Sequence, residues 1–282
     1  MLTVCPTPIG NLEDVTPRQR EALSQAEIIA CEDSRRTGKL LEHLGISRED
    51  GYPRLVPYHE HNEAEAAARL TNELRRGRDV VLVSDAGTPG ISDPGFELVR
   101  SAAEAGVEIT ALPGPCASIV ALSASGLPTN DFQFRGFPPS SAGKRRSFLE
   151  EIASKEMTTL LYEAPHRIEA LLEEIAAVYG DEREICVARE LTKLHEEYLR
   201  GSVREVRREL DTREQLRGEV VVVIEPVPNG SEKEALVDEK IRELLGRELS
   251  SRTIKEVVSE LYDVSRSSLY ERIERIEAES EE

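Results

Sequence analysis

The sequence lacks the hydrophobic runs and paired cysteines that mark membrane and secreted proteins. It contains no run of about 18 apolar residues and no charged-then-apolar leader, so we expect neither a membrane-spanning helix nor secretion. Its four cysteines are scattered, and none stands in a Cys-x-x-Cys pair: Cys5, Cys31, Cys116 and Cys186. Most lie in or beside apolar runs, so we expect reduced, buried thiols and a cytoplasmic protein.

Basic residues are also in short supply. Lysine and arginine total 36 against 54 aspartates and glutamates, which gives a formal net charge of −18. Affinity for nucleic-acid phosphates comes mainly from lysine and arginine, so wholesale wrapping of a nucleic acid is excluded and no binding to DNA is expected. Any contact with RNA must be a local basic patch on an acidic body. Adaptation to a salty cytosol is an alternative reason for the acidity.

The chain has neither a G-x-G-x-x-G motif nor the terminal Lys-Ser/Thr of a P-loop, which disfavours a nucleotide phosphate site. It does have a loop rich in small residues at 84–95, between the apolar run 80–83 and a helical pattern that starts near Phe96. Ligands of α/β sheets collect at the carboxyl ends of strands, where this loop should lie. We therefore interpret it as a binding loop rather than a packing turn, with Asp93 and Pro94 as the helix N-cap and first position.

Short apolar runs alternate with amphipathic segments, which predicts an α/β fold. Thr16 with Pro17 should start one helix, and Asn62 with Glu65 resembles a capping box for another. The predicted domains are an α/β domain with a mostly parallel sheet, an α/β domain with a mixed sheet, and a linker with a small helical domain, at 1–126, 127–226 and 227–282. The last resembles a helix-turn-helix, with a packing or dimerisation module as the alternative.

Several segments together resemble one known family. They are similar to the ribosomal RNA small subunit methyltransferase I family, a member of the tetrapyrrole methylase superfamily, at residues 6–14, 32–37, 58–63, 83–95, 113–115, 163–167 and 188–197. The resemblance implies two α/β domains with a cofactor cleft between them and a small C-terminal helical domain. It also implies S-adenosylmethionine as the cosubstrate and no metal ion.

The matching motifs indicate which residues of this chain should contact the cofactor. The resemblance implies that S-adenosylmethionine is bound by Pro8, Asp85, Ala86, Gly87, Cys116, Ala117, Ala164, Ala188 and Glu219. Members of the family usually have serine where this chain has Cys116. The thiol is a weaker hydrogen-bond partner than a hydroxyl, so this contact departs from the family pattern.

Methyl transfer to a ribose hydroxyl requires in-line positioning and gains from a general base or a nearby cation. Within the motifs, the candidates for these roles are Glu60, Lys193, Glu190 and Arg35. Lys193 would stabilise the developing alkoxide, and Glu60 or His59 would act as the base. Hydrogen-bonded capping and harmless surface exposure are the alternatives for these side chains. His59 and His61 could bind a metal ion, but no third ligand follows from the spacing.

Clustered cations are the candidates for contacts with RNA phosphates. They are Arg35, Arg36, Lys144, Arg145, Arg146, Arg167 and Arg189. Internal ion pairs and solvated helix faces are the competing interpretation.

The resemblance implies an S-adenosylmethionine-dependent methyltransferase that modifies the 2′-hydroxyl of a cytidine in the decoding region of 16S ribosomal RNA. The small ribosomal subunit would be its partner, and the enzyme would be a homodimer. One alternative is a methylase of a corrin or porphyrin precursor, which the arginine-rich segment 32–37 and the helical tail disfavour. Another is a non-catalytic RNA-binding assembly factor that retains the fold.

Overall fold

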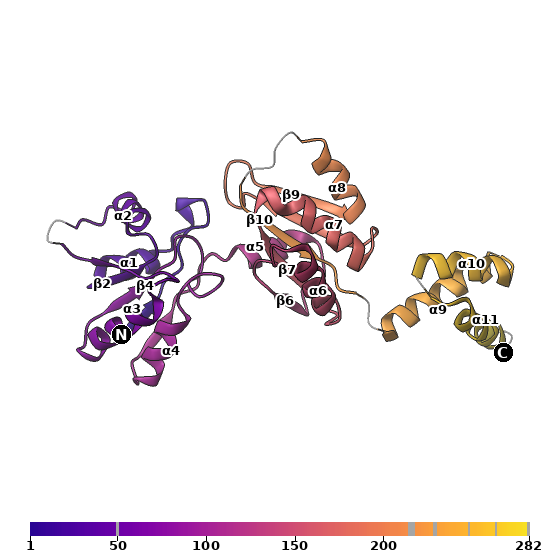
Figure 1. The fold of residues 1–282 in the computed structure, drawn as a ribbon, viewed down its shortest axis with the longest axis horizontal. Helices are drawn as coiled ribbons and strands as arrows, with labels where there is room; N and C mark the ends of the chain where they lie inside the picture. The colour runs from indigo at the N-terminus through magenta and orange to yellow at the C-terminus, as the bar shows by residue number, and fades with distance from the viewer. Residues whose placement is uncertain (49–50, 214–217, 228–229, 248, 263, 281–282) are drawn as a thin grey trace. The chain divides into compact units, whose positions relative to one another are not determined.

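The computed structural model describes residues 1–48, 51–213, 218–227, 230–247, 249–262 and 264–280. This described chain divides into two compact units (Figure 1). The first unit comprises residues 1–153 and 157–225, and the second comprises residues 226–282 together with 154–156. All strands of the described chain belong to the first unit.

A parallel sheet forms the first part of this unit. Its strands are β1 (Leu2–Val4), β2 (Ile28–Cys31), β3 (Arg54–Pro57), β4 (Val80–Leu82) and β5 (Ile109–Ala111). Their order is β3-β2-β4-β1-β5, and each neighbouring pair is parallel. The carboxyl ends of all these strands therefore meet at one edge of the sheet. The loops that follow β1, β2 and β4 are brought together there.

Helices cover both faces of this sheet, as the alternating pattern predicts. The connecting helices are α1 (Pro17–Gln25), α2 (Ser34–His43), α3 (Glu63–Arg75) and α4 (Phe96–Glu104), with a short 3-10 turn at Leu12–Asp14. Ile28 and Ala30 of β2 pack with α3 and α4, which lie side by side in Figure 1. Ile29 and Cys31 point to the opposite face and pack with α1 and α2. The two-residue period of the strand thus divides the core between two helix layers.

The second sheet is mixed, which confirms the expected difference in strand direction. It contains β6 (Phe132–Phe134), β7 (Thr158–Glu163), β8 (Glu184–Arg189), β9 (Glu197–Ser202) and β10 (Val220–Ile224). The order is β6-β7-β10-β8-β9, with β6 parallel to β7 and β10 antiparallel to both β7 and β8. Strand β10 consists of valines and one isoleucine. It lies between β7 and β8, and all of its residues are buried.

Helix α5 (Ala117–Ser125) packs against one face of this second sheet, on Leu160, Cys186 and Val221. Leu161 and Val222 alternate to the other face and are fully buried too. Helices α6 (Ala142–Ala153), α7 (Ile168–Tyr179) and α8 (Val203–Asp211) follow, with α7 in contact with both others. A domain boundary near residue 126 remains our proposal. Helix α5 precedes that boundary in the sequence but packs on the second sheet, which follows it.

The second unit is a helical bundle with its own core. It contains α9 (Gly230–Gly246), α10 (Ser251–Tyr262) and α11 (Arg266–Ser280). Its buried side chains are Val237, Ile241, Leu244, Ile254, Val258, Leu269, Ile273 and Ile276. Pro228, Asn229 and Asp263, which belong to the predicted linker and turn, lie outside the described residues. Nowhere in the described chain does a helix have the length and apolar character needed to cross a membrane.

Two predicted helix starts, those of α1 and α3, are correct in position, and the predicted start of α4 is wrong. Thr16 forms a complete capping box, because its hydroxyl accepts from Gln19 N at 3.2 Å and its own N–H donates to Gln19 Oε1 at 2.7 Å. Asn62 is the N-cap residue of α3, as predicted, but its side chain makes no capping bond: it accepts from His59 N and donates to the carbonyl of Pro57.

The predicted cap at Asp93 is wrong. Helix α4 begins at Phe96, and its N-cap is Gly95, which has φ +157°. A Cβ at position 95 would approach Gly90 N to 2.9 Å, so the chain doubles back on itself here. This close approach delays the helix by two residues and leaves Asp93 in the preceding loop.

Candidate functional site

The loop after β4 is fixed against the loop after β1. Thr7 and Gly87 exchange two backbone hydrogen bonds, each 2.9 Å long, and the Ser84 hydroxyl donates to the Gly87 carbonyl at 3.1 Å. Gly87 has φ +83°, a conformation that glycine adopts at no steric cost. A Cβ there would meet Ile9 Cγ2 at 3.3 Å. The small residues of this loop therefore allow two loops from different strands to meet closely.

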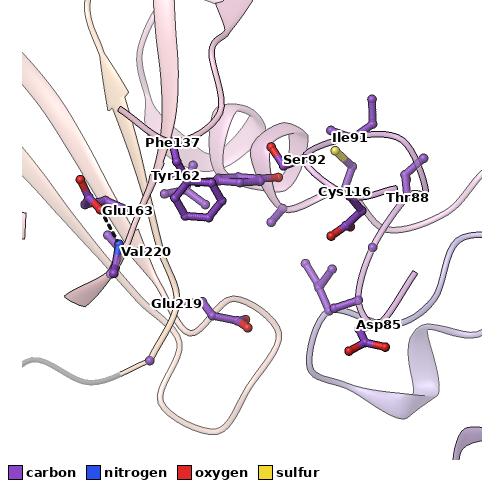
Figure 2. A pocket seen from close by; sticks show the side chains of 18 of the residues that line it. Asp85, Thr88, Ile91, Ser92, Cys116, Phe137, Tyr162, Glu163, Glu219 and Val220 are labelled. Carbon is purple, nitrogen blue, oxygen red and sulfur yellow. Dashed lines mark hydrogen bonds between the residues drawn. The ribbon is translucent and has the colours of Figure 1, made fainter. Parts of the chain in front are cut away.

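These loops form one wall of a cavity of about 470 Å³ (Figure 2). Figure 2 shows Asp85, Thr88 and Cys116 on one side, with Tyr162, Phe137 and Glu219 on the other. Both sheets of the first unit contribute to the lining, which consists of Ile9, Glu32, Arg36, Asp85, Ala86, Gly87, Thr88, Ile91, Ser92, Asp93, Cys116, Ala117, Phe137, Tyr162, Glu163, Ala164, Pro165, Gly218, Glu219, Val220 and Val221. A volume of this size suits a small molecule, since such pockets span about 300 to 1,000 Å³.

Acidic groups predominate in the described lining. This described lining contains one guanidinium, that of Arg36, and the carboxyl groups of Glu32, Asp85, Asp93, Glu163 and Glu219. Arg36 Nη1 lies 3.4 Å from Asp85 Oδ2, while Asp85 Oδ1 accepts from Asp33 N at 3.0 Å. Asp85 thus ties the loop after β4 to the loop after β2. A cavity with this charge balance favours a cationic ligand.

Glu163 is the most deeply buried of these carboxylates. Its side chain is 0% exposed, and its Oε1 accepts from Ala164 N at 2.8 Å and faces Arg167 Nε at 3.1 Å. Its Oε2 has no hydrogen-bond partner among the described residues. A buried carboxylate oxygen without a partner is costly, so a donor supplied by a ligand would satisfy it.

Two of the lining carboxyls have raised pKa values. Burial, followed by the charges of Glu32 and Asp85, raises the pKa of Asp93 to about 7. Burial and the charge of Asp85 also raise the pKa of Glu32 above its usual range. Asp93 is therefore close to half protonated at neutral pH. Strongly shifted groups inside a cavity are typical of functional sites.

Most of the predicted cofactor-binding residues line this cavity. Asp85, Ala86, Gly87, Cys116, Ala117, Ala164 and Glu219 are in its lining. Pro8 lines a smaller neighbouring cavity of about 230 Å³, which shares Arg36 and Asp85 with the first. Ala188 is not among the described lining residues, because its side chain is fully buried in the apolar core beneath α5. Cys116 Sγ lies 3.1 Å from Ser118 Oγ, and the other three cysteines are buried free thiols.

The predicted catalytic residues Glu60, Lys193, Glu190 and Arg35 are all absent from the described lining, and Lys193 contacts the lining residue Glu219. Lys193 Nζ donates to Glu190 Oε1 at 2.8 Å and to Glu219 Oε2 at 3.0 Å. Burial lowers the pKa of Lys193, but these two carboxylates outweigh it and raise the pKa overall. Glu60 is exposed and absent from the described lining, although its charge contributes to the raised pKa values of Glu32 and Asp93.

The predicted RNA-binding cations fall into two groups. Arg35 and Arg36 have side chains 88% and 69% exposed, and Lys144 and Arg146 are exposed as well. Arg145 is buried and donates to the Ser140 carbonyl, so it is not available to a phosphate as the charge run suggested.

Two further arginines are already held by the protein. Arg167 donates to the Pro138 carbonyl at 2.8 Å and pairs with Glu163. Arg189 Nη2 lies 3.2 Å from Glu197 Oε2. Arg189 and Glu197 are opposite each other on the neighbouring strands β8 and β9. Both arginines are therefore engaged by groups of the fold.

Sequence reasoning missed several lining residues. It gave no role in the cavity to Glu32, Asp93, Phe137, Tyr162 or Glu163. Glu32 directly follows β2, and Tyr162 and Glu163 end β7, so their position at strand carboxyl ends was an available signal. Asp93 had no such signal, because the helix-cap pattern accounted for it. Within the described chain, no group of histidine, cysteine, aspartate and glutamate side chains is arranged to hold a metal ion.

Comparison with known proteins adds a family match. Residues 1–207 match the family model described as Tetrapyrrole (Corrin/Porphyrin) Methylases. The chain is 40% identical over 274 residues to the ribosomal RNA small subunit methyltransferase I of Haemophilus influenzae, covering 96% of this chain and 95% of that one. It is 39% identical over 282 residues to the protein of the same name from Synechocystis, covering 99% of each.

Solved structures show the same fold. The methyltransferase CobJ matches with a TM-score of 0.59 and 24% identity, covering 80% of this chain and 94% of that one. Diphthine synthase matches with a TM-score of 0.59 and 17% identity, covering 79% of this chain and 89% of that one. At these identities the likeness concerns the arrangement of the two sheets and their helices.

Proposed function

The chain belongs to the tetrapyrrole methylase family and, within it, to the ribosomal RNA small subunit methyltransferases I, and from this premise we propose that it methylates 16S ribosomal RNA with S-adenosylmethionine. We propose further that the acceptor is the 2′-hydroxyl of a cytidine in the decoding region, presented by the small ribosomal subunit. The observation that carries the proposal is the acidic cavity beside the loop after β4.

The residues of this cavity fit the methyl donor. Its volume of about 470 Å³ suits a nucleoside with an amino-acid arm, and the surplus of carboxylates suits a positively charged sulfur. Phe137 and Tyr162 meet edge to face with ring centroids 5.6 Å apart, which provides an apolar surface for a purine. We therefore assign the donor to Asp85, Ala86, Gly87, Cys116, Ala117, Ala164 and Glu219, with Pro8 at the adjoining cavity.

S-adenosylmethionine supplies an activated methyl group, so the protein has to position the acceptor oxygen and exclude water. Lys193 is fixed between Glu190 and Glu219, and its raised pKa keeps it positively charged at neutral pH. A cation that is held by the lining residue Glu219 is suited to stabilise a developing alkoxide. We accordingly propose Lys193, positioned by Glu190, as the electrostatic catalyst, and Glu60 as an exposed proton acceptor near the entrance.

RNA would contact only a local part of this acidic protein. Arg35 and Arg36 begin α2 at the edge where the strands end, next to the cavity. Lys144 and Arg146 are exposed on α6. We propose that these four cations bind phosphates, which position the nucleotide without reading its sequence.

We propose a homodimer as well, and a cytoplasmic location remains a prediction. Leu194 is 92% exposed and Leu12 is 41% exposed. Their segments touch, because Asn11 N donates to Thr192 Oγ1 at 3.0 Å. Exposed apolar side chains on adjoining loops favour a protein contact, and sedimentation equilibrium would measure the assembly directly.

One experiment tests the proposed reaction. The protein is incubated with S-adenosylmethionine labelled in its methyl group and with small subunits from cells that lack this modification, and the labelled nucleotide is then mapped. We expect label at one cytidine ribose of the decoding region. Label in a corrin or porphyrin precursor would instead identify a tetrapyrrole methylase. Subunit binding without any donor binding would identify a non-catalytic assembly factor.

The role of Arg35 can be separated from donor binding. Arg35→Ala should raise the KM for small subunits about tenfold, which corresponds to one lost charge-assisted hydrogen bond, and should leave donor affinity unchanged. The helix start should survive, because Asp33 Oδ1 accepts from the backbone N–H of residue 35 at 2.8 Å. Arg100→Ala is the matched control, since Arg100 is exposed on α4 and pairs with Glu104. Equal KM values in both variants would remove Arg35 from the RNA-binding surface.

A further inference from the structure

Asp93 occupies an unusual place in the loop between β4 and α4. It lines the cavity rather than capping the helix, and the residue before it, Ser92, has φ +62°. A serine in this left-handed region costs about 1 to 2 kcal/mol relative to ordinary backbone. Gly95 and Gly90 then approach each other closely and close the loop. The loop backbone thus holds the Asp93 carboxyl on the cavity side at an energetic cost.

Charged and polar groups surround this carboxyl from several elements. Glu32 follows β2, Glu60 follows β3 and Asp85 follows β4, and each of these charges disfavours ionisation of Asp93. Tyr162 of β7 lies close enough for Asp93 to raise its pKa. Arg36 of α2 also lines the cavity but is engaged by Asp85. Asp93 is therefore the carboxyl at which the negative charge of several strand ends converges.

Ser84 opposes the effect of these charges. A hydrogen bond from its hydroxyl favours the ionised form of Asp93 and lowers the pKa of that carboxyl. The same hydroxyl lies 3.1 Å from the Gly87 carbonyl and 3.4 Å from the Ala86 carbonyl. A hydroxyl has one hydrogen, so these carbonyls compete with Asp93 for it.

The cavity also holds evidence that a positive group belongs in it. Carboxyls outnumber guanidinium groups in the described lining, and Glu163 Oε2 is buried there without a hydrogen-bond partner. Bringing a cation into this low-dielectric space favours the ionised form of every carboxyl nearby. A carboxyl that is still partly protonated at neutral pH, as Asp93 is, responds by losing its proton.

We propose that Asp93 is the charge sensor of the donor cavity: it holds a proton when no cation is bound and releases it when the positively charged methyl donor enters. This inference rests on the proposed function, because it assigns the cavity to S-adenosylmethionine. After methyl transfer the sulfur of S-adenosylhomocysteine is uncharged, so Asp93 regains its proton and one attraction to the ligand is lost. Asp93 thereby discriminates the donor from its product.

Proton linkage fixes the sign of the pH dependence. The pKa of Asp93 is about 7 without ligand, and a bound cation lowers it. Donor binding therefore releases a proton, and donor affinity rises with pH until the carboxyl is ionised in the unbound protein as well. The Kd for the donor should fall about tenfold per pH unit below neutrality and level off above it. The Kd for S-adenosylhomocysteine should change less than about twofold over the same range.

Calorimetry on the full chain measures this proton directly. Binding heats at about pH 6 are compared in buffers of different ionisation enthalpy, and their slope gives the number of protons released. We expect nearly one proton for S-adenosylmethionine and close to none for S-adenosylhomocysteine. Asp93→Asn should abolish the release and flatten the pH dependence while retaining product binding. Asp211→Asn, an identical change at the exposed end of α8, should match wild type.

The outcomes separate this inference from the proposed function. Donor binding by the wild type without proton release would overturn the inference and leave the function intact. Loss of the release in Glu32→Gln but not in Asp93→Asn would also overturn it, because Glu32 would then be the sensor. Absence of binding of both ligands at any pH would contradict the proposed function itself. If Asp93→Asn does not fold, Glu32→Gln decides: proton release that persists in Glu32→Gln supports Asp93, and its loss there overturns the inference.

Discussion

Replacing Gly87 with valine should reduce affinity for S-adenosylmethionine at least about a hundredfold and lower the free energy of unfolding by about 2 to 3 kcal/mol. Gly87 has φ +83°, where a β-branched side chain is strongly disfavoured. Its new Cβ would press on Ile9 Cγ2 at 3.3 Å and lie 3.7 Å from the Pro115 carbonyl. Both Gly87 and Ile9 line the cavity, so relief of this contact would displace the binding surface itself.

Gly38→Ala provides the control for this substitution. Gly38 lies inside α2, and a Cβ there meets nothing within 4 Å. This change should stabilise the protein by about 0.5 to 1 kcal/mol, because glycine is a poor helix former. Urea unfolding gives both stabilities, and calorimetry gives both donor affinities. A Gly87→Val protein that unfolds and binds the donor as wild type does would show that the loop tolerates a side chain and lies away from the ligand.

Asp85→Ala should have the second largest effect, a loss of donor affinity of about tenfold to a hundredfold. Asp85 accepts a hydrogen bond from Asp33 N and pairs with Arg36, so it joins the loops after β2 and β4. Its removal leaves the Asp33 N–H without this acceptor and releases the guanidinium of Arg36. The cavity would then lose a wall contact and a negative charge together, and calorimetric titration of the donor measures the result.

Asp85→Asn distinguishes the two contributions. The amide oxygen can still accept from Asp33 N, but the negative charge that faces Arg36 and the donor is gone. Affinity between those of wild type and Asp85→Ala would mean that both loop geometry and charge contribute to binding. If Asp85→Ala binds the donor as tightly as wild type, the assignment of Asp85 to the donor site is wrong.

The α/β layout follows from local patterns that the structure confirms. Residues Ile28 to Cys31 form one apolar run, and their alternate side chains supply the two opposite cores of the first sheet. Thr16 caps α1 as its spacing predicts, because all groups of a capping box lie within four residues. Signals of this kind depend only on neighbours in the sequence. They are therefore readable without knowledge of tertiary contacts.

The capping bond that Asn62 lacks and the wrong start of α4 both depend on contacts that a local pattern cannot contain. Asn62 bonds to His59 and Pro57, which closes the turn before α3 instead of capping it. Asp93 is displaced by the close approach of Gly90 and Gly95 and faces carboxyls that follow two other strands, Glu32 after β2 and Glu60 after β3. In each case the side chain has the right chemistry for a cap, and another partner is nearer.

Some residues of the candidate site could likewise be predicted from the local sequence, and others depend on tertiary contacts. Gly87 and Asp85 belong to a continuous loop whose composition already indicated binding, and both line the cavity. Arg145 stands in a basic run that reads as solvent-exposed, yet the fold buries it against Ser140. Tyr162 and Glu219 are 57 positions apart in the sequence and meet at the cavity only because β7 and β10 are neighbours. No spacing rule connects such residues before the sheet order is known.

The position of β10 also determines when the cavity can exist during synthesis. This strand is the last of the second sheet to emerge from the ribosome, yet it separates β7 from β8 in the completed order. Until Val220 to Ile224 are available, a nascent chain exposes two unpaired strand edges and lacks the wall formed by residues 218–221. The parallel sheet, with the cavity wall formed by the loop after β4, can assemble early, whereas the second sheet and the opposite wall close late, through pairings distant in the sequence.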